Sequence, residues 1–448
     1  MLPSEFQETS TSSEQVLNLE HKLIFSSLPL SQPPRSLPSL HMMHFPLLFP
    51  LLFQLSSSAQ LSISGVRELP SRTSSFSPPN SLWVGGDSSA SLCPPDQGFC
   101  WWIWADTLLG TVYMNETTSM DNRNLTGMPH NSLSVLDLGS GEVEFLGSPF
   151  GEGSVEYKSG LFRTDDFPES YLWPINGVNV GTPGGDIDIM VIMSMRVSSV
   201  GFLNITTSSM VLVDGLGAVK NPERPERWEY EVVDVPSGRG EDGGCEVYWT
   251  LGTVVEGDWL YIAGGVRGGG IALSRVGVKN VEGREKNINI ITGISSISGE
   301  FFEYLTPAGW SSMGEFVPEN LQSILPADAD ADRPDCTEGT IDKHPSLGIY
   351  YFVCLQAGDP RLLFAYTDSE SIGDVDARWN LSYPYAVPGE LSDGFPLSAY
   401  AAKSHPALAG DDTVVVSYNT NTNAGFEGLT NSTVGYHPRF VELTLEWG

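Results

Sequence analysis

The sequence predicts an all-β fold, and three observations support this prediction. From residue 81 onward, short apolar or aromatic runs alternate with clusters of Gly, Pro, Asn and Asp, as around Ile187–Met195 and Thr413–Tyr418. Many runs alternate polar and apolar residues, or are short and fully apolar, and both patterns are typical of strands. The chain also contains 47 Gly, 31 Pro and 10% aromatic residues, a composition that favours many short strands over a helical bundle.

The predicted strands come in about five sets, which begin near Leu82, Tyr171, Cys245, Glu338 and Ala401. In each set, a strand with polar or aromatic residues precedes a strongly hydrophobic strand and one or two amphipathic strands. Radially repeated four-stranded sheets are the propeller solution to exposed sheet edges, so we expect a five-bladed β-propeller over residues 81–448. A pair of two-sheet sandwiches stays open as the alternative. The innermost strand of each blade would line a central funnel, so the polar residues that begin each set are the pocket candidates.

A targeting signal precedes the predicted propeller. Met42 and Met43 lead into the apolar run Phe45–Leu55, and small residues follow up to a plausible cleavage point after Ala59. This run is too short to span a bilayer comfortably, so we expect a signal peptide over residues 42–59, with a signal anchor as the alternative. We expect residues 1–41 to be a gene-model extension or disordered, and residues 60–80 to be a disordered linker.

The sequons and cysteines indicate the secretory pathway, as the predicted signal peptide does. Cys93 and Cys100 are close enough to staple one loop, and Cys336 and Cys354 are able to link a strand pair, which leaves Cys245 buried and unpaired. No cysteine or histidine has zinc-ligand spacing, and we assign no metal or cofactor. We therefore expect a secreted, disulfide-containing glycoprotein. Its five Asn-x-Ser/Thr sequons are at Asn115, Asn124, Asn204, Asn380 and Asn431.

The charge excludes one class of partner. The chain has 23 basic and 55 acidic residues, a formal charge of −32. Such an acidic surface repels phosphate backbones, so nucleic acid is not an expected partner. The charge is typical of an extracellular protein that stays in solution, and we expect a monomer with no stable membrane span.

Two aspartates are the candidate catalytic pair. Asp87 ends the apolar run that starts at Trp83, and Asp106 ends the Trp-rich run Trp101–Ala105. Carboxylates at the ends of adjacent strands are able to face one space, and glycoside hydrolysis needs one protonated acid and one nucleophile or base. An apolar surround would raise the pKa of one member of the pair. The alternative is that both are turn residues, since Asp is favoured after strands.

Further polar and aromatic residues at the starts of the sets are candidates for substrate binding. The ring of Trp173 would stack on a sugar, although a buried Trp is the commoner role. His130 and Asn131 would donate hydrogen bonds to sugar hydroxyls, or form a structural turn. The full set of candidates is His130, Asn131, Trp173, Glu246, Glu338, His405 and Tyr418.

At these residues the sequence resembles a family of extracellular propellers, a domain of unknown function related to bacterial endo-D-arabinanases. That family shares a five-bladed fold with arabinanase- and invertase-type furanosidases. The resemblance implies a retaining glycosidase whose two closely spaced aspartates correspond to Asp87 and Asp106. The matching segments are Leu82–Asp87, Ile103–Gly110, Met128–Leu136, Tyr171–Gly177, Ser404–Leu408, Val415–Asn421 and Tyr436–Val441.

The sequence departs from the family at two places that affect the pocket. Trp104-Ala105 replaces the usual Phe-Gly before Asp106, and a cysteine-flanked insertion follows Asp87. The leading hypothesis is thus a glycoside hydrolase that acts on a furanose-containing or related extracellular polysaccharide through Asp87 and Asp106. The competing hypothesis is a non-catalytic glycan-binding or cell-surface propeller.

Overall fold

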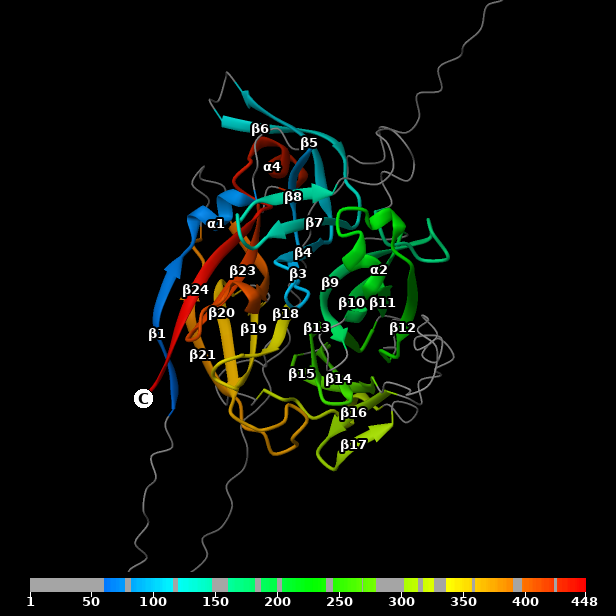
Figure 1. Ribbon diagram of the computed structural model, residues 1–448, viewed down its shortest axis with the longest axis vertical. Helices are drawn as coiled ribbons and strands as arrows, with labels where there is room; N and C mark the ends of the chain where they lie inside the picture. Colours follow the sequence, from blue (N-terminus) through cyan, green and yellow to red (C-terminus); the bar gives the residue numbers. More distant parts are fainter. Residues whose placement is uncertain are drawn as a thin grey trace, which may run out of the picture. The chain divides into compact units, whose positions relative to one another are not determined.

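The computed structural model (Figure 1) describes residues 60–76, 82–115, 120–146, 160–181, 187–199, 204–238, 245–267, 269–278, 302–312, 317–325, 336–356, 359–389, 397–422 and 425–448. The expected extension 1–41 and signal peptide 42–59 lie outside these residues. The chain divides into two compact units. The larger unit, Ile63–Glu446, contains nearly all the described residues. Of the other unit only residues 60–62 and 447–448 are described, and in it Gly448 N donates to Gln60 O at 3.0 Å.

Helices in the described ranges are short, and strands dominate, as the sequence predicts. Within those ranges no helix is long and apolar enough to cross a membrane. The helical segments are α1 (Pro70–Ser75), α2 (Gly215–Lys220) and α4 (Gly425–Asn431), with 3-10 turns η2 (Pro225–Arg227), η5 (Pro318–Asn320) and η6 (Pro406–Leu408).

The described strands form antiparallel sheets, and five of these sheets have four or five strands. The first comprises β3 (Ala90–Leu92), β4 (Phe99–Trp104), β7 (Ser132–Asp137) and β8 (Val143–Leu146). The second comprises β9 (Ser170–Gly181), β10 (Ile187–Ser198), β11 (Ile205–Asp214) and β12 (Tyr230–Val235). The third comprises β13 (Val247–Glu256), β14 (Trp259–Val266), β15 (Ile271–Gly277), β16 (Phe302–Thr306) and β17 (Gly309–Ser312). The fourth comprises β18 (Cys336–Lys343), β19 (Tyr350–Gln356), β20 (Arg361–Thr367) and β21 (Asn380–Ala386). The fifth comprises β22 (Leu397–Ser404), β23 (Thr413–Thr422), β24 (Pro438–Trp447) and β1 (Leu61–Glu68).

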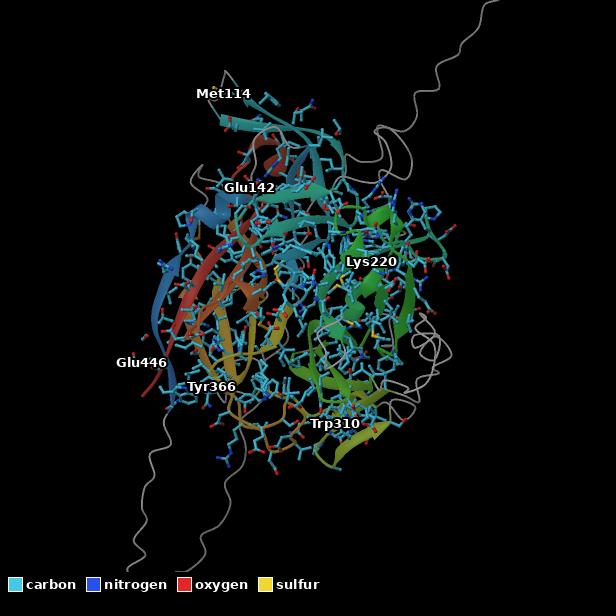
Figure 2. The ribbon with its side chains drawn as sticks, viewed as in Figure 1. Met114, Glu142, Lys220, Trp310, Tyr366 and Glu446 are labelled. Atoms are coloured by element: carbon cyan, nitrogen blue, oxygen red, sulfur yellow. A yellow bond between two sulfur atoms is a disulfide. The ribbon has the colours of Figure 1, made fainter. Side chains whose placement is uncertain are left out.

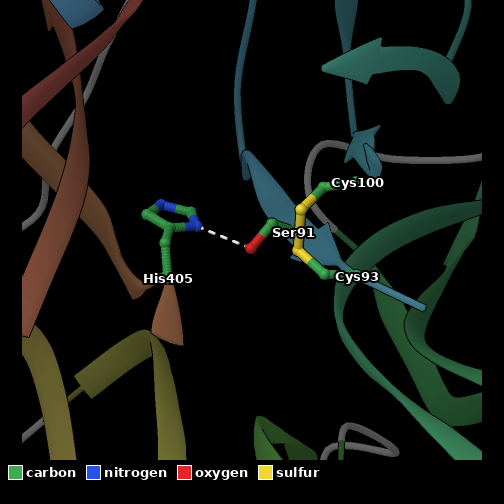
Figure 3. Close-up of a disulfide and its surroundings, with 4 residues drawn as sticks. All are labelled: Ser91, Cys93, Cys100 and His405. Atoms are coloured by element: carbon green, nitrogen blue, oxygen red, sulfur yellow. Dashed lines mark hydrogen bonds between the residues drawn. A yellow bond between two sulfur atoms is a disulfide. The ribbon is translucent and has the colours of Figure 1, made fainter. Parts of the chain in front are cut away.

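The first strands of these five sheets contact one another in chain order. β3 contacts β9, β9 contacts β13, β13 contacts β18, and β18 contacts β22. The Ser91 hydroxyl of β3 lies 2.8 Å from Nδ1 of His405, the residue that follows β22, and this bond returns to the first sheet (Figure 3). The arrangement is propeller-like, because successive sheets meet through their first strands.

The tryptophans of β4 show how one sheet packs between two others. Trp101 belongs to a buried cluster with Leu172 of the second sheet. Trp102 and Trp104, whose side chains are fully buried, belong to a cluster with Phe440 of the fifth sheet. Side chains alternate across a strand, so the fully apolar sequence of β4 is explained by burial on both faces.

Residues 60–80 are not wholly a disordered linker as predicted. β1 lies at the edge of the fifth sheet beside β24, and α1 follows it (Figure 1). The backbone N of Leu69 donates to Phe440 O at 2.8 Å, and Arg67 forms an ion pair with Glu442 at 2.7 Å. The strand was missed because most of its residues are exposed, so it has no strong apolar pattern.

The first predicted set also differs from the structure. The run near Leu82 forms β2 (Trp83–Gly86), which pairs not with β3 but with β5 (Thr107–Asn115) and through it with β6 (Met120–Gly127) in a separate three-stranded sheet. Ser88, at φ 64, turns the chain between β2 and β3. The side chain of Met114 near the end of β5 is exposed (Figure 2).

The predicted cysteine pairs are both present as disulfides. Cys93 is bonded to Cys100 beside β3 and β4 (Figure 3), and Cys336 of β18 is bonded to Cys354 of β19. Cys245 belongs to neither disulfide and is buried.

Candidate functional site

Backbone hydrogen bonds hold the segments of Asp87 and Asp106 side by side. Asp87 directly follows β2, and Asp106 lies between β4 and β5. The N of Asp87 donates to Asp106 O at 3.2 Å, and the N of Ala105 donates to Asp87 O at 3.0 Å. The two strand ends thus meet as the sequence predicts, while the catalytic role of the pair stays a prediction.

The carboxyl group of Asp87 has two unlike oxygens. Its Oδ2 accepts hydrogen bonds from the hydroxyls of Tyr400 and Tyr436, each at 3.0 Å. Its Oδ1 is buried and has no hydrogen-bond partner among the described residues. Burial raises the pKa of Asp87 well above its usual value, and the negative charges of Asp106 and Glu338 raise it further, whereas the two tyrosine bonds oppose the shift. These surroundings favour the protonated acid.

Asp106 is surrounded by N–H donors instead. Its Oδ1 accepts from His130 Nδ1 at 2.9 Å and from Trp173 Nε1 at 2.8 Å. The His130 ring stacks on Tyr171, with 3.6 Å between ring centroids and 13° between the planes. This stacking fixes the imidazole so that its Nδ1 faces the carboxylate. Two of the predicted substrate-binding residues, His130 and Trp173, therefore contact a predicted catalytic residue directly.

Glu338 of β18 is the third carboxyl group of the cluster. Its Oε2 accepts from the Ser88 hydroxyl at 2.7 Å and lies 3.3 Å from Lys403 Nζ. The Lys403 side chain is 0% exposed, and its Nζ also donates to Gly339 O at 3.3 Å. Burial lowers the pKa of Lys403, and the charge of Glu338 partly restores it.

Two other candidate residues use their polar atoms within the fold. Asn131 Nδ2 donates to the carbonyls of Phe162 and Leu172, each at 3.0 Å, and its Oδ1 accepts from Phe162 N at 2.7 Å. His405 Nδ1 contacts Ser91, and its Nε2 lies 2.7 Å from the Ser417 hydroxyl. Burial lowers the pKa of His405 well below its usual value, so the ring is neutral. A sugar contact to either residue would require these bonds to break.

No described contact joins the last two candidates, Tyr418 and Glu246, to the carboxyl cluster. The buried Tyr418 places its hydroxyl 3.2 Å from that of Tyr385. Glu246 precedes β13, and its backbone oxygen accepts from Arg267 N. Their roles in binding stay predictions.

Sequence reasoning did not assign four residues that complete the cluster: Ser88, Tyr400, Lys403 and Tyr436. Only Lys403 carries a sequence signal, because it is a lone charge within a run of small and apolar residues that begins at Ala399. A charge in such a run indicates a buried, paired cation. Within the described ranges, no group of three or more His, Cys, Asp or Glu side chains is positioned to hold a metal ion.

Comparisons with known proteins identify the fold but no family. No protein-family model matches the sequence, and no curated protein matches it. A solved structure described as a putative hydrolase from Bacteroides ovatus is similar, with a TM-score of 0.60 and 14% sequence identity over 84% of this chain and 90% of that chain. This likeness extends over most of both chains and shows a shared fold.

More distant likenesses are to propeller glycoside hydrolases. The α-L-arabinofuranosidase of Podospora anserina has a TM-score of 0.41 and 11% identity, over 82% of this chain and 93% of that chain. An exo-1,5-α-L-arabinanase from a bovine ruminal metagenomic library has a TM-score of 0.38 and 10% identity, over 81% of this chain and 94% of that chain. At these values the site geometry of this chain has to carry any functional argument.

Proposed function

We propose that the protein is a secreted glycoside hydrolase that acts on a furanose-containing or related polysaccharide, with its five larger sheets as the blades of a propeller. One observation carries the proposal. Asp87 lies in surroundings that favour the protonated acid, whereas Asp106 beside it accepts hydrogen bonds from two N–H donors, an arrangement suited to the acid and the base or nucleophile of a glycosidase.

Asp87 is the proton donor in this mechanism. Tyr400 and Tyr436 both donate to Oδ2, which leaves Oδ1 as the oxygen that carries the proton when the carboxyl group is neutral. Oδ1 has no hydrogen-bond partner among the described residues. Once substrate binding exposes Oδ1, its protonation of the glycosidic oxygen would release the leaving sugar.

Asp106 is the negatively charged partner. Hydrogen bonds from His130 and Trp173 stabilise its carboxylate and fix its orientation. It serves as the nucleophile if the anomeric configuration is retained, or as the base that activates water if it is inverted. The tyrosines are poor nucleophiles, because burial raises the pKa of Tyr400 and Tyr436 well above the usual value and the phenolate is disfavoured.

Secretion is supported by two kinds of observation. The structure contains two disulfides, and disulfides form and persist in oxidising compartments. The sequon residues Asn124, Asn204 and Asn380 are exposed to solvent, as glycosylation requires.

The test is to produce the full chain in a eukaryotic secretory host, recover it from the medium, and measure reducing-end release on a panel of polysaccharides. We expect Asp87→Asn and Asp106→Asn each to lower the rate by about 10²–10⁴-fold, the usual range for loss of an acid or base. Asp368→Asn, at an exposed position, is the matched control.

Three outcomes would overturn parts of the proposal. Activity that survives both substitutions excludes the pair. Binding to a glycan with no cleavage of any substrate favours the non-catalytic glycan-binding propeller. Protein retained in the cells contradicts secretion. Where cleavage occurs, NMR of the first-formed anomer distinguishes a nucleophilic Asp106 from a basic one.

A further inference from the structure

Arg123 of β6 is a buried cation held only by backbone oxygens among its described contacts. The residue is 3% exposed. Burial lowers its pKa to about 10. Its guanidinium donates to the carbonyl oxygens of Val84, Leu429, Ser432, Thr433 and Gly435.

These carbonyls belong to the two segments that bring Asp87 and Tyr436 together. Val84 lies in β2, three residues before Asp87, and accepts from Arg123 Nε at 2.7 Å. The other four acceptors lie between Leu429 and Gly435, directly before Tyr436, and Gly435 accepts from Nη2 at 2.6 Å. One guanidinium therefore joins the strand of the acid to the loop of its hydrogen-bond donor.

Tyr436 is held in a conformation that needs such support. Its φ is 62°, in the left-handed region, which a residue other than Gly adopts at an energetic cost. Its N donates to Thr420 O at 2.6 Å, and its O accepts from Gly86 N at 2.9 Å. A Cβ on Gly85 would lie 2.8 Å from that same Tyr436 oxygen, so β2 and the loop approach as closely as glycine allows.

We propose that Arg123 is a positioning residue, which fixes the Leu429–Gly435 segment, the end of α4 and the loop after it, so that the Tyr436 hydroxyl stays on Oδ2 of Asp87. The planar guanidinium, with five N–H donors in a fixed fork, suits this task, whereas an ammonium has three donors at one point. This segment leads directly into the strained Tyr436. A less rigid segment therefore lets the Tyr436 hydroxyl move away from Asp87.

The consequence for Asp87 has a definite sign. A hydrogen bond from Tyr436 stabilises the carboxylate form and lowers the pKa of Asp87. Loss of that bond raises this pKa further. The charged and titratable groups that act on Asp87 are Asp106, Glu338, Lys403, Tyr400 and Tyr436, and the substitutions below leave the first four unchanged.

The test measures the Asp87 pKa directly and needs no catalysis. The full chain is labelled with aspartate carrying 13C at the carboxyl carbon, titrated by NMR, and the Asp87 signal is assigned by its loss in Asp87→Asn. We expect Tyr436→Phe to raise this pKa by about one unit, from the usual strength of a hydrogen bond to a charged group. Arg123→Lys should raise it in the same direction by a smaller amount.

The double variant tests whether Arg123 affects the Asp87 pKa through Tyr436. Added to Tyr436→Phe, Arg123→Lys should cause no further rise, because the hydroxyl that it positions is already absent. Arg378→Lys, at an exposed position, is the matched control and should leave the pKa unchanged.

A folded Arg123→Lys protein with an unchanged Asp87 pKa overturns the proposal, and so does an equal rise in the Tyr436→Phe background. If Arg123→Lys does not fold, Ser432→Ala loosens the same loop by removing the bond from Val434 N to Ser432 Oγ, and no rise there also overturns it. The catalytic meaning of Arg123 rests on the proposed function. Because the titration does not, a lack of glycan cleavage would leave the positioning result intact.

Discussion

The two ends of β18 present carboxyl groups on the same face of one strand but give them different partners. Glu338, Thr340 and Asp342 share that face, because side chains alternate along a strand, and β22 contacts this strand. Glu338 meets the ammonium of Lys403. Among its described contacts, Asp342 accepts a side-chain hydrogen bond from the Ser404 hydroxyl alone, and burial raises the pKa of Asp342 to about 7.

Two carboxyl groups on one face of a strand thus have different partners, because the neighbouring strand places a cation beside Glu338 and a hydroxyl beside Asp342. Glu338 and Lys403 form an ion pair close to Asp87. The negative charge of Glu338 contributes to the raised pKa of Asp87. At the other end, Asp342 has no cation among its described contacts and favours the neutral acid.

The largest loss of stability is expected from removal of the cation that pairs with Glu338. Lys403→Met leaves Glu338 buried without its cation, and loss of one partner of a buried pair costs about 3–5 kcal/mol. Urea unfolding at pH 7 measures this loss, and Lys220→Met, at an exposed position, is the control. The double variant with Glu338→Gln should recover most of the stability. A single variant that loses under about 1 kcal/mol would mean that the pair is effectively solvated.

A smaller effect on stability is expected from substitution of Asp342, and this effect depends on pH. Since the pKa of Asp342 is raised to about 7 in the folded protein, the unfolded chain releases this proton first. The contribution of Asp342 to stability is therefore fully present below pH about 4 and decreases as pH rises to about 7. Asp342→Asn removes this dependence.

We expect the stability of Asp342→Asn relative to the wild type to increase by about 2 kcal/mol between pH 4 and 7.5, an allowance for solvent screening of a partly buried group. Free energies of unfolding at several pH values check this, with Asp368→Asn as the control. A flat difference between variant and wild type would show that the pKa of Asp342 is the same in the folded and unfolded chains.

The smallest loss of stability is expected from substitution of Thr340, which lies between Glu338 and Asp342 on β18. The Thr340 hydroxyl lies 2.6 Å from that of Ser404 and accepts from Ser404 N at 2.7 Å. Thr340→Val should cost about 1 kcal/mol, the net contribution of a hydrogen bond, with the unpaired Ser404 N as the main cause. Thermal unfolding detects this loss. A shift as large as that of Lys403→Met would mean that the hydroxyl pair matters as much as the buried charges.

The sequence predicted the parts of the site that are local. Asp87 and Asp106 end neighbouring runs, and the structure joins those runs through backbone bonds. His130 and Trp173 come from the next runs along the chain, and both bind Asp106. The fold class and both disulfides also followed from local patterns.

Three of the four missed residues come from the far end of the chain, and the fourth, Ser88, directly follows Asp87. Tyr400, Lys403 and Tyr436 reach the site only because the fifth sheet lies beside the first, an arrangement that no periodic pattern encodes. β1 was missed because most of its residues are exposed, and the partner that orders it, β24, is hundreds of residues away. Conversely, His405 had the right composition for a binding residue, but the serines that occupy its two nitrogens are not part of any local pattern.

The pairing of β1 with β24 has a consequence for how the protein is made. β1 leaves the ribosome hundreds of residues before β24, its neighbour in the sheet. At translation rates of about 5–20 residues per second, the fifth sheet stays incomplete for on the order of tens of seconds. During this time β23 and β24 are missing, so the edge that β1 will occupy does not yet exist. The fifth sheet is thus completed only after β24 has emerged.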